Sequence, residues 1–227
     1  MNELITTGFI LALKDYYYLI NRSYSRTECL KLTGNRYMLN KMQRIVLNRG
    51  VFRKDEADKR INKKVTTFTR QSVYIDGYNV LFTIGNYLLG RPVFISNDSF
   101  LRDAGELHGK LQKGKPFFRA LDLLLHYLEH FRQKEYIFLF DQPVPGSIDI
   151  QQIINELIRN SSLEGEARTV PDPDEVLIRL NDGMIATSDS EIIDQTDKQV
   201  IDVATEVLTG AFQPTFINLS ELLTIQV

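Results

Sequence analysis

The chain has 227 residues, of which 43% are hydrophobic and 25% are charged. These proportions are ordinary for a globular protein and exclude a disordered or fibrous chain. The most membrane-like stretch, residues 4–20, is interrupted by Lys14 and Asp15, so it falls short of the ~20 apolar residues that a span requires. We therefore expect a cytoplasmic protein without a membrane partner. Cys29 is the single cysteine, which excludes an intrachain disulfide and a cysteine-rich zinc site.

The formal charge of −2 conceals two regions of opposite sign. Residues 1–70 hold 15 Lys and Arg against 6 Asp and Glu, whereas the rest of the chain holds 12 against 23. A basic region beside an acidic one suggests an anionic ligand for the first and metal cations for the carboxylates of the second. Charges that only face solvent are the alternative interpretation.

The first part of the chain has the periodicity of helices. Apolar residues recur at helical spacing over residues 4–20 and 37–49. Between these two stretches, Ser25 and Glu28 have the spacing of a capping box, which predicts the start of another helix. The sequence therefore predicts a module of three helices.

Two glycines stand where these helices would end. Gly34 and Gly50 occupy the positions of left-handed caps for the second and third helices. The charged stretch after Gly50 is typical of a linker or a helix end. We expect a basic helical domain with its linker at residues 1–65 and a second domain at residues 66–227.

Cations of two regions are candidates for contacts with a nucleic-acid backbone. Four of them lie on or next to the stretch 37–49, and they are Arg36, Lys41, Arg44 and Arg49. A basic amphipathic helix that packs on its neighbour is the competing interpretation. Two more, Lys113 and Lys115, belong to a segment that has the spacing of a phosphate-binding loop. Pro116 replaces the hydroxyl residue that such a loop needs, so we expect phosphate contacts or a solvated loop there.

From residue 72 onward, short β-rich runs alternate with helical segments. This pattern predicts an α/β domain with a mainly parallel sheet. The expected strands are SVYI (72–75), EYIFLF (135–140), EARTV (166–170), GMIATS (183–188) and TFIN (215–218). The expected helices are Phe117–Phe131, Ile148–Asn160 and Asp194–Leu208. Residues 88–115 have no regular pattern.

Four of the expected strands end in carboxylates. Asp76 and Asp141 follow two of them directly, Asp189 follows a third, and the fourth leads into Asp172 and Asp174, of which we favour Asp174. Because the carboxyl ends of parallel strands share one edge of a sheet, we expect these acids to converge. The alternative interpretation of each acid taken alone is that it forms a turn or caps the next helix.

Clustered carboxylates repel one another unless a cation neutralises them. Oxygen ligands without His or Cys favour Mg²⁺ or Mn²⁺ over zinc. Asn79, three residues after Asp76, is a candidate to hold that carboxylate or a metal-bound water. Asp103 and Glu106 are spaced to share a helix face and are candidates for a further acidic ligand.

The segments VYIDGYNVLF, FLFDQP, PDPDEVL and IATSDSEIID, in this order, resemble the acidic motifs of PIN-like nuclease domains, particularly those of the NYN branch. The resemblance covers residues 72–220 and implies a Rossmann-like sheet and a metal-dependent ribonuclease. It implies site acids at Asp76, Asp141, Asp174 and Asp189, with Asn79 as a supporting amide. The helical acid of many such nucleases has no plain counterpart here.

The N-terminal part also looks like a small helical domain that precedes such a nuclease domain in uncharacterised prokaryotic proteins. We therefore expect a ribonuclease that depends on Mg²⁺ or Mn²⁺ and whose helical domain helps to recruit RNA. An inactive RNA-binding or protein-interaction module with the same fold is the alternative. A phosphatase with an aspartate nucleophile fits less well, because the first strand ends in Asp-Gly-Tyr instead of Asp-x-Asp.

Overall fold

The computed structural model describes residues 4–105 and 114–226. The chain folds into two compact units. The first consists of Met1–Asn62, Gly90–Glu106 and Thr215–Val227, and the second of Lys63–Leu89 and Leu107–Pro214. The sequence predicts two consecutive parts, whereas two later segments join the N-terminal helices, because their strands pair with each other in a sheet of the first unit.

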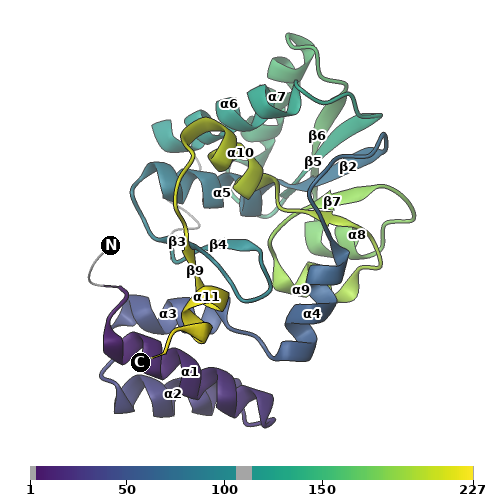
Figure 1. Ribbon diagram of the computed structural model, residues 1–227. Helices are drawn as coiled ribbons and strands as arrows, with labels where there is room; N and C mark the ends of the chain where they lie inside the picture. The colour runs from purple at the N-terminus through teal and green to yellow at the C-terminus, as the bar shows by residue number, and fades with distance from the viewer. Residues whose placement is uncertain (1–3, 106–113, 227) are drawn as a thin grey trace. The chain divides into compact units, whose positions relative to one another are not determined.

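The second unit is built on a sheet of six strands, all paired in parallel (Figure 1). In spatial order they are β1 (Lys64–Val65), β8 (Val200–Ile201), β7 (Met184–Ala186), β2 (Ser72–Asp76), β5 (Glu135–Asp141) and β6 (Gly165–Val170). This arrangement confirms the predicted α/β class with a Rossmann-like parallel sheet. Four expected strands are confirmed in it, whereas the two-residue strands β1 and β8 were not predicted.

The order of the strands creates a switch point beside β2. From β2 the chain moves outward on one side to β5 and β6, and it then returns to the other side of β2 for β7 and β8. The connections after β2 and β7 therefore leave in opposite directions. In open α/β sheets, ligands bind at the carboxyl ends of the strands at such a point.

The described residues of this unit form six helices: α5 (Gly77–Leu88), α6 (Lys115–Leu128), α7 (Ser147–Arg159), α8 (Pro173–Ile178), α9 (Ser190–Gln195) and α10 (Val203–Phe212). Figure 1 shows α5, α6 and α10 together on one side of the sheet and α8 and α9 on the other. The predictions of helices near α6 and α7 are confirmed. Helix α5 was not predicted, because it is buried on almost every face and has no polar stripe.

The predicted helix Asp194–Leu208 is wrong. Its residues form the end of α9, the strand β8 and the first half of α10. Val200 and Ile201 are β-branched and fully buried next to β7, which favours a strand. Asp202 then starts α10, because its carboxylate accepts hydrogen bonds from the Thr205 amide at 3.2 Å and the Thr205 hydroxyl at 2.7 Å.

The first unit combines helices with a small sheet. It contains α1 (Thr7–Asn21), α2 (Arg26–Arg36), α3 (Lys41–Gly50), almost all of α4 (Lys54–Lys63) and α11 (Leu219–Thr224). Its strands are β4 (Leu101–Asp103), β3 (Val93–Ile95) and β9 (Ile217–Asn218). The expected run 215–218 is thus a strand, but it pairs with β3 in this sheet and not with the parallel sheet. Phe94 and Leu219 pack into one core with α1 and α3.

The predicted helix caps of the first unit need correction. The capping box is formed by Asn40 and Gln43 at the start of α3, whereas the Ser25 side chain makes no capping hydrogen bond. Gly34 lies within α2, and neither it nor Gly50 has a positive φ. A Cβ on Gly34 would lie 2.0 Å from Arg44 Nη1, and one on Gly50 would lie 2.4 Å from Phe94, so both glycines allow close packing.

Residues other than glycine take the left-handed positions after α1 and α2. These are Ser23, with a φ of 63°, and Met38, with a φ of 50°. The Leu39 amide donates to the Gly34 carbonyl at 2.8 Å, and the Met38 amide donates to the Asn35 carbonyl at 3.2 Å. The end of α2 therefore curls back as in a glycine-capped helix, but with a methionine that is 88% exposed.

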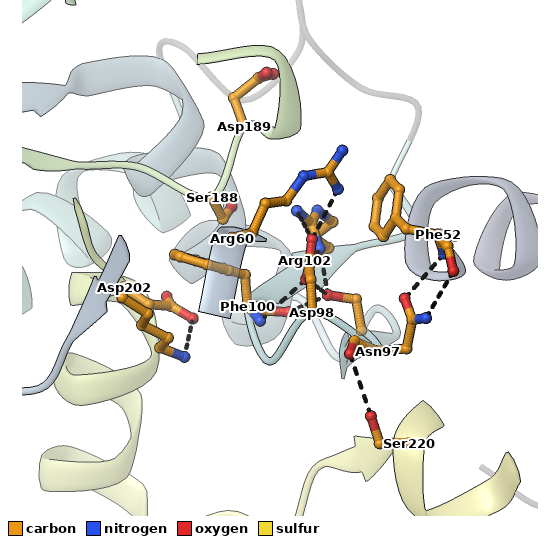
Figure 2. Close-up of polar contacts among 12 residues, drawn as sticks. Phe52, Arg60, Asn97, Asp98, Phe100, Arg102, Ser188, Asp189, Asp202 and Ser220 are labelled. Carbon is orange, nitrogen blue, oxygen red and sulfur yellow. Dashed lines mark hydrogen bonds and ion pairs between the residues drawn. The ribbon is translucent and has the colours of Figure 1, made fainter. Parts of the chain in front are cut away.

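A buried ion cluster connects α4 with the hairpin of β3 and β4 (Figure 2). Asp98 is fully buried, and its carboxylate accepts hydrogen bonds from Arg60 at 2.9 Å and from both terminal nitrogens of Arg102 at 2.6 and 2.8 Å. Both guanidinium groups lie over the ring of Phe52, at 4.0 and 4.7 Å from its centroid. These cations hold the pKa of Asp98 down at about 2 although burial alone would raise it.

The neighbouring Asn97 fixes the same hairpin to the segment after α3. Its side chain accepts from the Phe52 amide and donates to the Phe52 carbonyl, both at 2.9 Å. Figure 2 also shows the Ser220 hydroxyl donating to the Asn97 carbonyl, at 3.4 Å. Three separate stretches of the sequence thus meet around one buried loop of the first unit.

Candidate functional site

Asp76 lies at the carboxyl end of the central strand β2 and caps the helix α5 that follows. Its Oδ1 accepts a hydrogen bond from the Asn79 amide at 3.4 Å, and its Oδ2 accepts one from the Thr187 hydroxyl at 2.8 Å. The residue is only 8% exposed. The buried strand ends in a charge because this carboxylate both starts the next helix and faces the segment after β7.

Gly77 allows α5 to start close to β5. A Cβ on this residue would lie 2.3 Å from the ring of Phe140 and 2.8 Å from the Leu139 carbonyl oxygen. Any side chain at this position would therefore push α5 away from the sheet and move Asp76 with it. The glycine of the Asp-Gly-Tyr-Asn segment serves close packing.

The side chain of Asn79, in the first turn of α5, connects this helix with the loop after β7. Its Oδ1 accepts hydrogen bonds from the amide and from the hydroxyl of Ser188, both at 3.0 Å. Its link to Asp76 is made by the backbone amide and not by the predicted side-chain amide. Asn79 therefore ties the start of α5 to the loop after β7 at the switch point.

Thr187 is a further residue of this site, which the sequence analysis did not single out. Its hydroxyl donates to Asp76 and accepts a hydrogen bond from the Asp189 amide at 3.0 Å. Asp189 itself caps α9 through the Glu191 amide at 2.7 Å. The signal that could have identified Thr187 is a hydroxyl residue two positions before a strand-end acid.

The third and fourth acids come from the next strands of the sheet. Asp141 is the half-buried last residue of β5, and Asp174 lies in the first turn of α8, after β6. Asp172 caps α8, because its Oδ1 accepts from the Glu175 amide at 3.0 Å. Asp172 thus has a local structural role, whereas Asp174 is exposed and leaves its carboxylate available.

Neighbouring acids contribute to the raised pKa of two of the four acids, Asp76 and Asp174. Burial, followed by the charges of Asp189 and Asp174, raises the pKa of Asp76 to about 7, although the Thr187 hydrogen bond lowers it. Desolvation, followed by the charges of Asp189 and Asp141, raises the pKa of Asp174 to about 6, although water screens this exposed group. The pKa of Asp141 is also raised, chiefly by burial. These mutual effects indicate that acids from four separate segments converge.

We call these four residues, Asp76, Asp141, Asp174 and Asp189, the acidic edge. Within the described part of the chain, none of them forms an ion pair with Lys, Arg or His. Their ligand chemistry is oxygen only, which suits a hard cation such as Mg²⁺ or Mn²⁺. As the side chains stand, no three His, Cys, Asp or Glu residues among those described are grouped closely enough to hold a metal ion.

Asp103 has other partners. It is a buried residue of β4 in the first unit, and its Oδ1 accepts from the Gly105 amide at 2.8 Å and lies 3.7 Å from Arg49. The prediction that Glu106 could supply the further acid falls on a residue outside the described ranges. No described residue therefore stands out as the missing helical acid.

Two of the predicted nucleic-acid contacts are used within the protein. Arg44 donates to the Leu39 carbonyl and to Asn35, both at 3.0 Å, which fixes the turn between α2 and α3. Arg49 donates to the Gly105 carbonyl at 3.3 Å and pairs with Asp103. The helical spacing of Arg44 and Arg49 predicted contacts with a nucleic acid, but it could not reveal these acceptors within the protein.

Three further predicted cations, Arg36, Lys41 and Lys115, are exposed. The Arg36 side chain is 70% exposed and lies 3.9 Å from Asp15, and Lys41 is an exposed first residue of α3. Lys115 is an exposed first residue of α6, and Lys113 lies outside the described residues. Arg36, Lys41 and Lys115 are thus placed where a large anion could reach them.

Two family models match adjacent parts of the chain. Residues 65–206 match a model described as "Domain of unknown function (DUF5616)", which is more than half of the chain. The chain belongs to this family. Residues 9–63 match a model described as "Protein of unknown function (DUF434)".

A relative from an archaeon extends over both parts. The "Uncharacterized protein MJ0935" of Methanocaldococcus jannaschii is 34% identical over 200 residues, which is 87% of this chain and 95% of the relative. No solved structure matches at a significant level. These names carry no activity, so functional inference depends on the acidic edge. No helix in residues 4–105 and 114–226 is long and apolar enough to span a membrane.

Proposed function

We propose that the acidic edge binds Mg²⁺ or Mn²⁺ and hydrolyses phosphodiester bonds of RNA. The observation that carries this proposal is the convergence of four carboxylates at the switch point of a parallel sheet, without a cationic partner among the described residues. Acids that raise one another's pKa are an unfavourable arrangement for stability alone. A divalent cation would remove that repulsion.

The acidic edge and the two residues that support it have different parts in this proposal. Asp76, Asp141, Asp174 and Asp189 would hold the cation, which when bound activates water and neutralises charge on the phosphate. Thr187 orients the Asp76 carboxylate through its hydrogen bond, and Asn79 ties the start of α5 to the loop after β7. The resemblance of the strand-end segments to NYN-type nucleases supports the same assignment.

RNA is the favoured substrate because the basic N-terminal part suits a polyanion. The count of 15 cations against 6 acids in residues 1–70 supports this choice, as do the exposed positions of Arg36 and Lys41. Arg44 and Arg49 are left out of the proposed contact set, since their side chains serve the turn before α3 and the hairpin of β4.

The test is cleavage of a mixed pool of labelled structured and single-stranded RNAs with Mn²⁺, Mg²⁺ or a chelator. Wild type would be compared with Asp76→Asn and Asp189→Asn. The matched control is Asp182→Asn, an exposed acid that precedes β7 at the opposite edge of the sheet. We expect metal-dependent cleavage that both edge variants lose and the control keeps.

The inactive binding module is the outcome that would replace this proposal. It would show as RNA binding without cleavage under every metal condition, with affinity unchanged or increased in Asp76→Asn, because a negative charge near phosphate is removed. Cleavage that persists in both edge variants would also overturn the assignment of the site.

A further inference from the structure

Lys63 makes an unusual set of contacts at the end of α4. Its ammonium group donates to three backbone carbonyls, those of Ile193 at 2.6 Å, Asp194 at 3.1 Å and Thr196 at 2.7 Å. An ammonium group has three donors, so all of them are used. These acceptors are 130 to 133 residues away in sequence and lie at the carboxyl end of α9.

Helix α9 depends on such support. It has six residues, carries no basic residue in its last turn, and ends at Thr196 in an extended conformation without a left-handed cap. A helix this short is not stable by itself, and its last carbonyls have no partners within the helix. Lys63 supplies both the missing donors and the positive charge that favours a helix C-terminus.

The opposite end of α9 begins at the acidic edge. Asp189 caps the helix by accepting from the Glu191 amide at 2.7 Å and the Ile192 amide at 3.5 Å. Its own amide donates to Thr187, whose hydroxyl donates to Asp76. Because α9 is less than two turns long, a change at its last carbonyls also changes the orientation of its first amides.

We infer that Lys63 is a positioning residue that holds α9, and through it Asp189, in the geometry of the acidic edge. The role of Lys63 in placing Asp189 does not depend on the proposed function. Its effect on Mn²⁺ binding does rest on the proposed function. Nothing in the local sequence indicates this role, since Lys63 lies in the charged stretch after Gly50, which is typical of a linker or a helix end. A lysine at this position is therefore a part of the site that lies outside every acidic motif.

The first test is amide hydrogen exchange on the full chain, comparing wild type with Lys63→Met, Lys63→Arg and Lys59→Met. Lys59 is an exposed lysine of the same helix and serves as the matched control. We expect Lys63→Met to accelerate exchange about tenfold at Thr196, and also at Glu191 and Ile192, which Asp189 caps. Lys63→Arg should restore protection, and Lys59→Met should leave it unchanged.

Faster exchange at Thr196 alone would overturn the inference, because Lys63 would then only cap the end of α9. Equal acceleration throughout the chain, including Phe138 in the middle of β5, would also overturn it, because it would report global destabilisation. Both results can be measured by amide hydrogen exchange without any metal or RNA.

The second test is the Mn²⁺ concentration that half-saturates the protein, measured by calorimetry at a temperature where every variant is folded. Lys63→Met should raise this concentration about tenfold, and Lys63→Arg should restore it. An unchanged midpoint together with a lower melting temperature would reduce Lys63 to a structural role. If wild type itself binds no Mn²⁺, the proposed function fails, while the exchange data still decide the role of Lys63.

Discussion

Asp98 in the first unit and Asp76 in the second are both buried aspartates, yet their surroundings shift their pKa in opposite directions. Asp98 lies between Arg60 and Arg102, which hold its pKa down at about 2. Burial raises the pKa of Asp76 to about 7, and the charges of Asp189 and Asp174 add to this rise, with no described cation beside it to oppose them. Burial disfavours the charged form at both sites, and the neighbouring charges decide the result.

The comparison distinguishes a completed cluster from an incomplete one. Around Asp98 the chain itself supplies the counter-charges, and the cluster stabilises the hairpin of β3 and β4. Around Asp76 the chain supplies more negative charge, which must be relieved by a proton or by a ligand. A cluster of acids without counter-charges at a switch point is the arrangement expected of a cation site. A cluster in which the acid is paired with arginines is the arrangement expected of a structural core.

The largest expected effect comes from breaking the paired cluster. Asp98→Asn would leave two buried guanidinium groups without a counter-charge, which we expect to destabilise the protein by about 3–5 kcal/mol. Urea unfolding at neutral pH measures this loss. Asp58→Asn, which removes an exposed partner of Lys54, is the control and should change little. A small loss for Asp98→Asn would mean that the arginines find water.

The corresponding change at the acidic edge should have the opposite sign. Because the folded pKa of Asp76, about 7, lies above its ordinary value of 3.8, the stabilising protonated form is fully present below pH 3.8 and is lost as the pH rises through about 7. Asp76→Asn cannot ionise. Its stability relative to wild type should therefore increase from about pH 4 to about pH 7, by at most about 4 kcal/mol.

Urea unfolding over this pH range, in the presence of a chelator, measures the effect of Asp76→Asn. Asp182→Asn controls for the general loss of one negative charge and should show no such pH dependence. A variant that is less stable than wild type at every pH would show that the carboxylate is stabilising as it stands, and the contrast with Asp98 would disappear.

A bound metal ion should supply the counter-charge that Asp76 lacks in wild type and so remove its difference from Asp98. Mn²⁺ at about 100 times its dissociation constant should stabilise the folded protein by about 2.7 kcal/mol. Binding should require more Mn²⁺ at pH 6 than at pH 8, because the metal competes with the proton of Asp76. Thermal unfolding over a Mn²⁺ series tests both statements, and Asp189→Asn should abolish the stabilisation. Equal stabilisation of the variant would point to a different metal site.

The smallest expected effect involves no charge at all. Met38 is 88% exposed and has a positive φ, a conformation that is unfavourable for a residue with a Cβ. Met38→Gly should stabilise the protein by about 0.5–1 kcal/mol. Met38→Ala removes the same exposed side chain but keeps the Cβ, so it should not stabilise. If both variants behave alike, the backbone at Met38 is not strained.

Much of the sheet could be predicted from local patterns. The strands β2, β5, β6 and β7 lie in short runs that their own residues mark, and each is followed by an acid. The strands β1 and β8 have two residues each, so their existence depends on pairing with β7 and with each other. The partner of β9 could not be predicted either, because a strand's residues do not specify which sheet it joins.

The candidate site was predictable to a similar degree. Strand-end acids are visible in sequence because parallel strands must bring their carboxyl ends to one edge. Thr187 and Lys63 were not visible, since a hydroxyl within a strand run and a lysine within a charged stretch have many ordinary roles. Their importance depends on the acceptors opposite them, Asp76 in one case and the carbonyls of α9 in the other.

The sequence by itself determined the class of the second unit and the set of acids at its edge, because apolar periodicity and strand ends are local properties. Only the tertiary structure decided which charges are paired. Asp98 and Arg60 are 38 residues apart, and Asp76 and Thr187 are 111 apart. The energy of a charge depends on burial and on neighbours within a few ångströms, and distance along the chain says little about either.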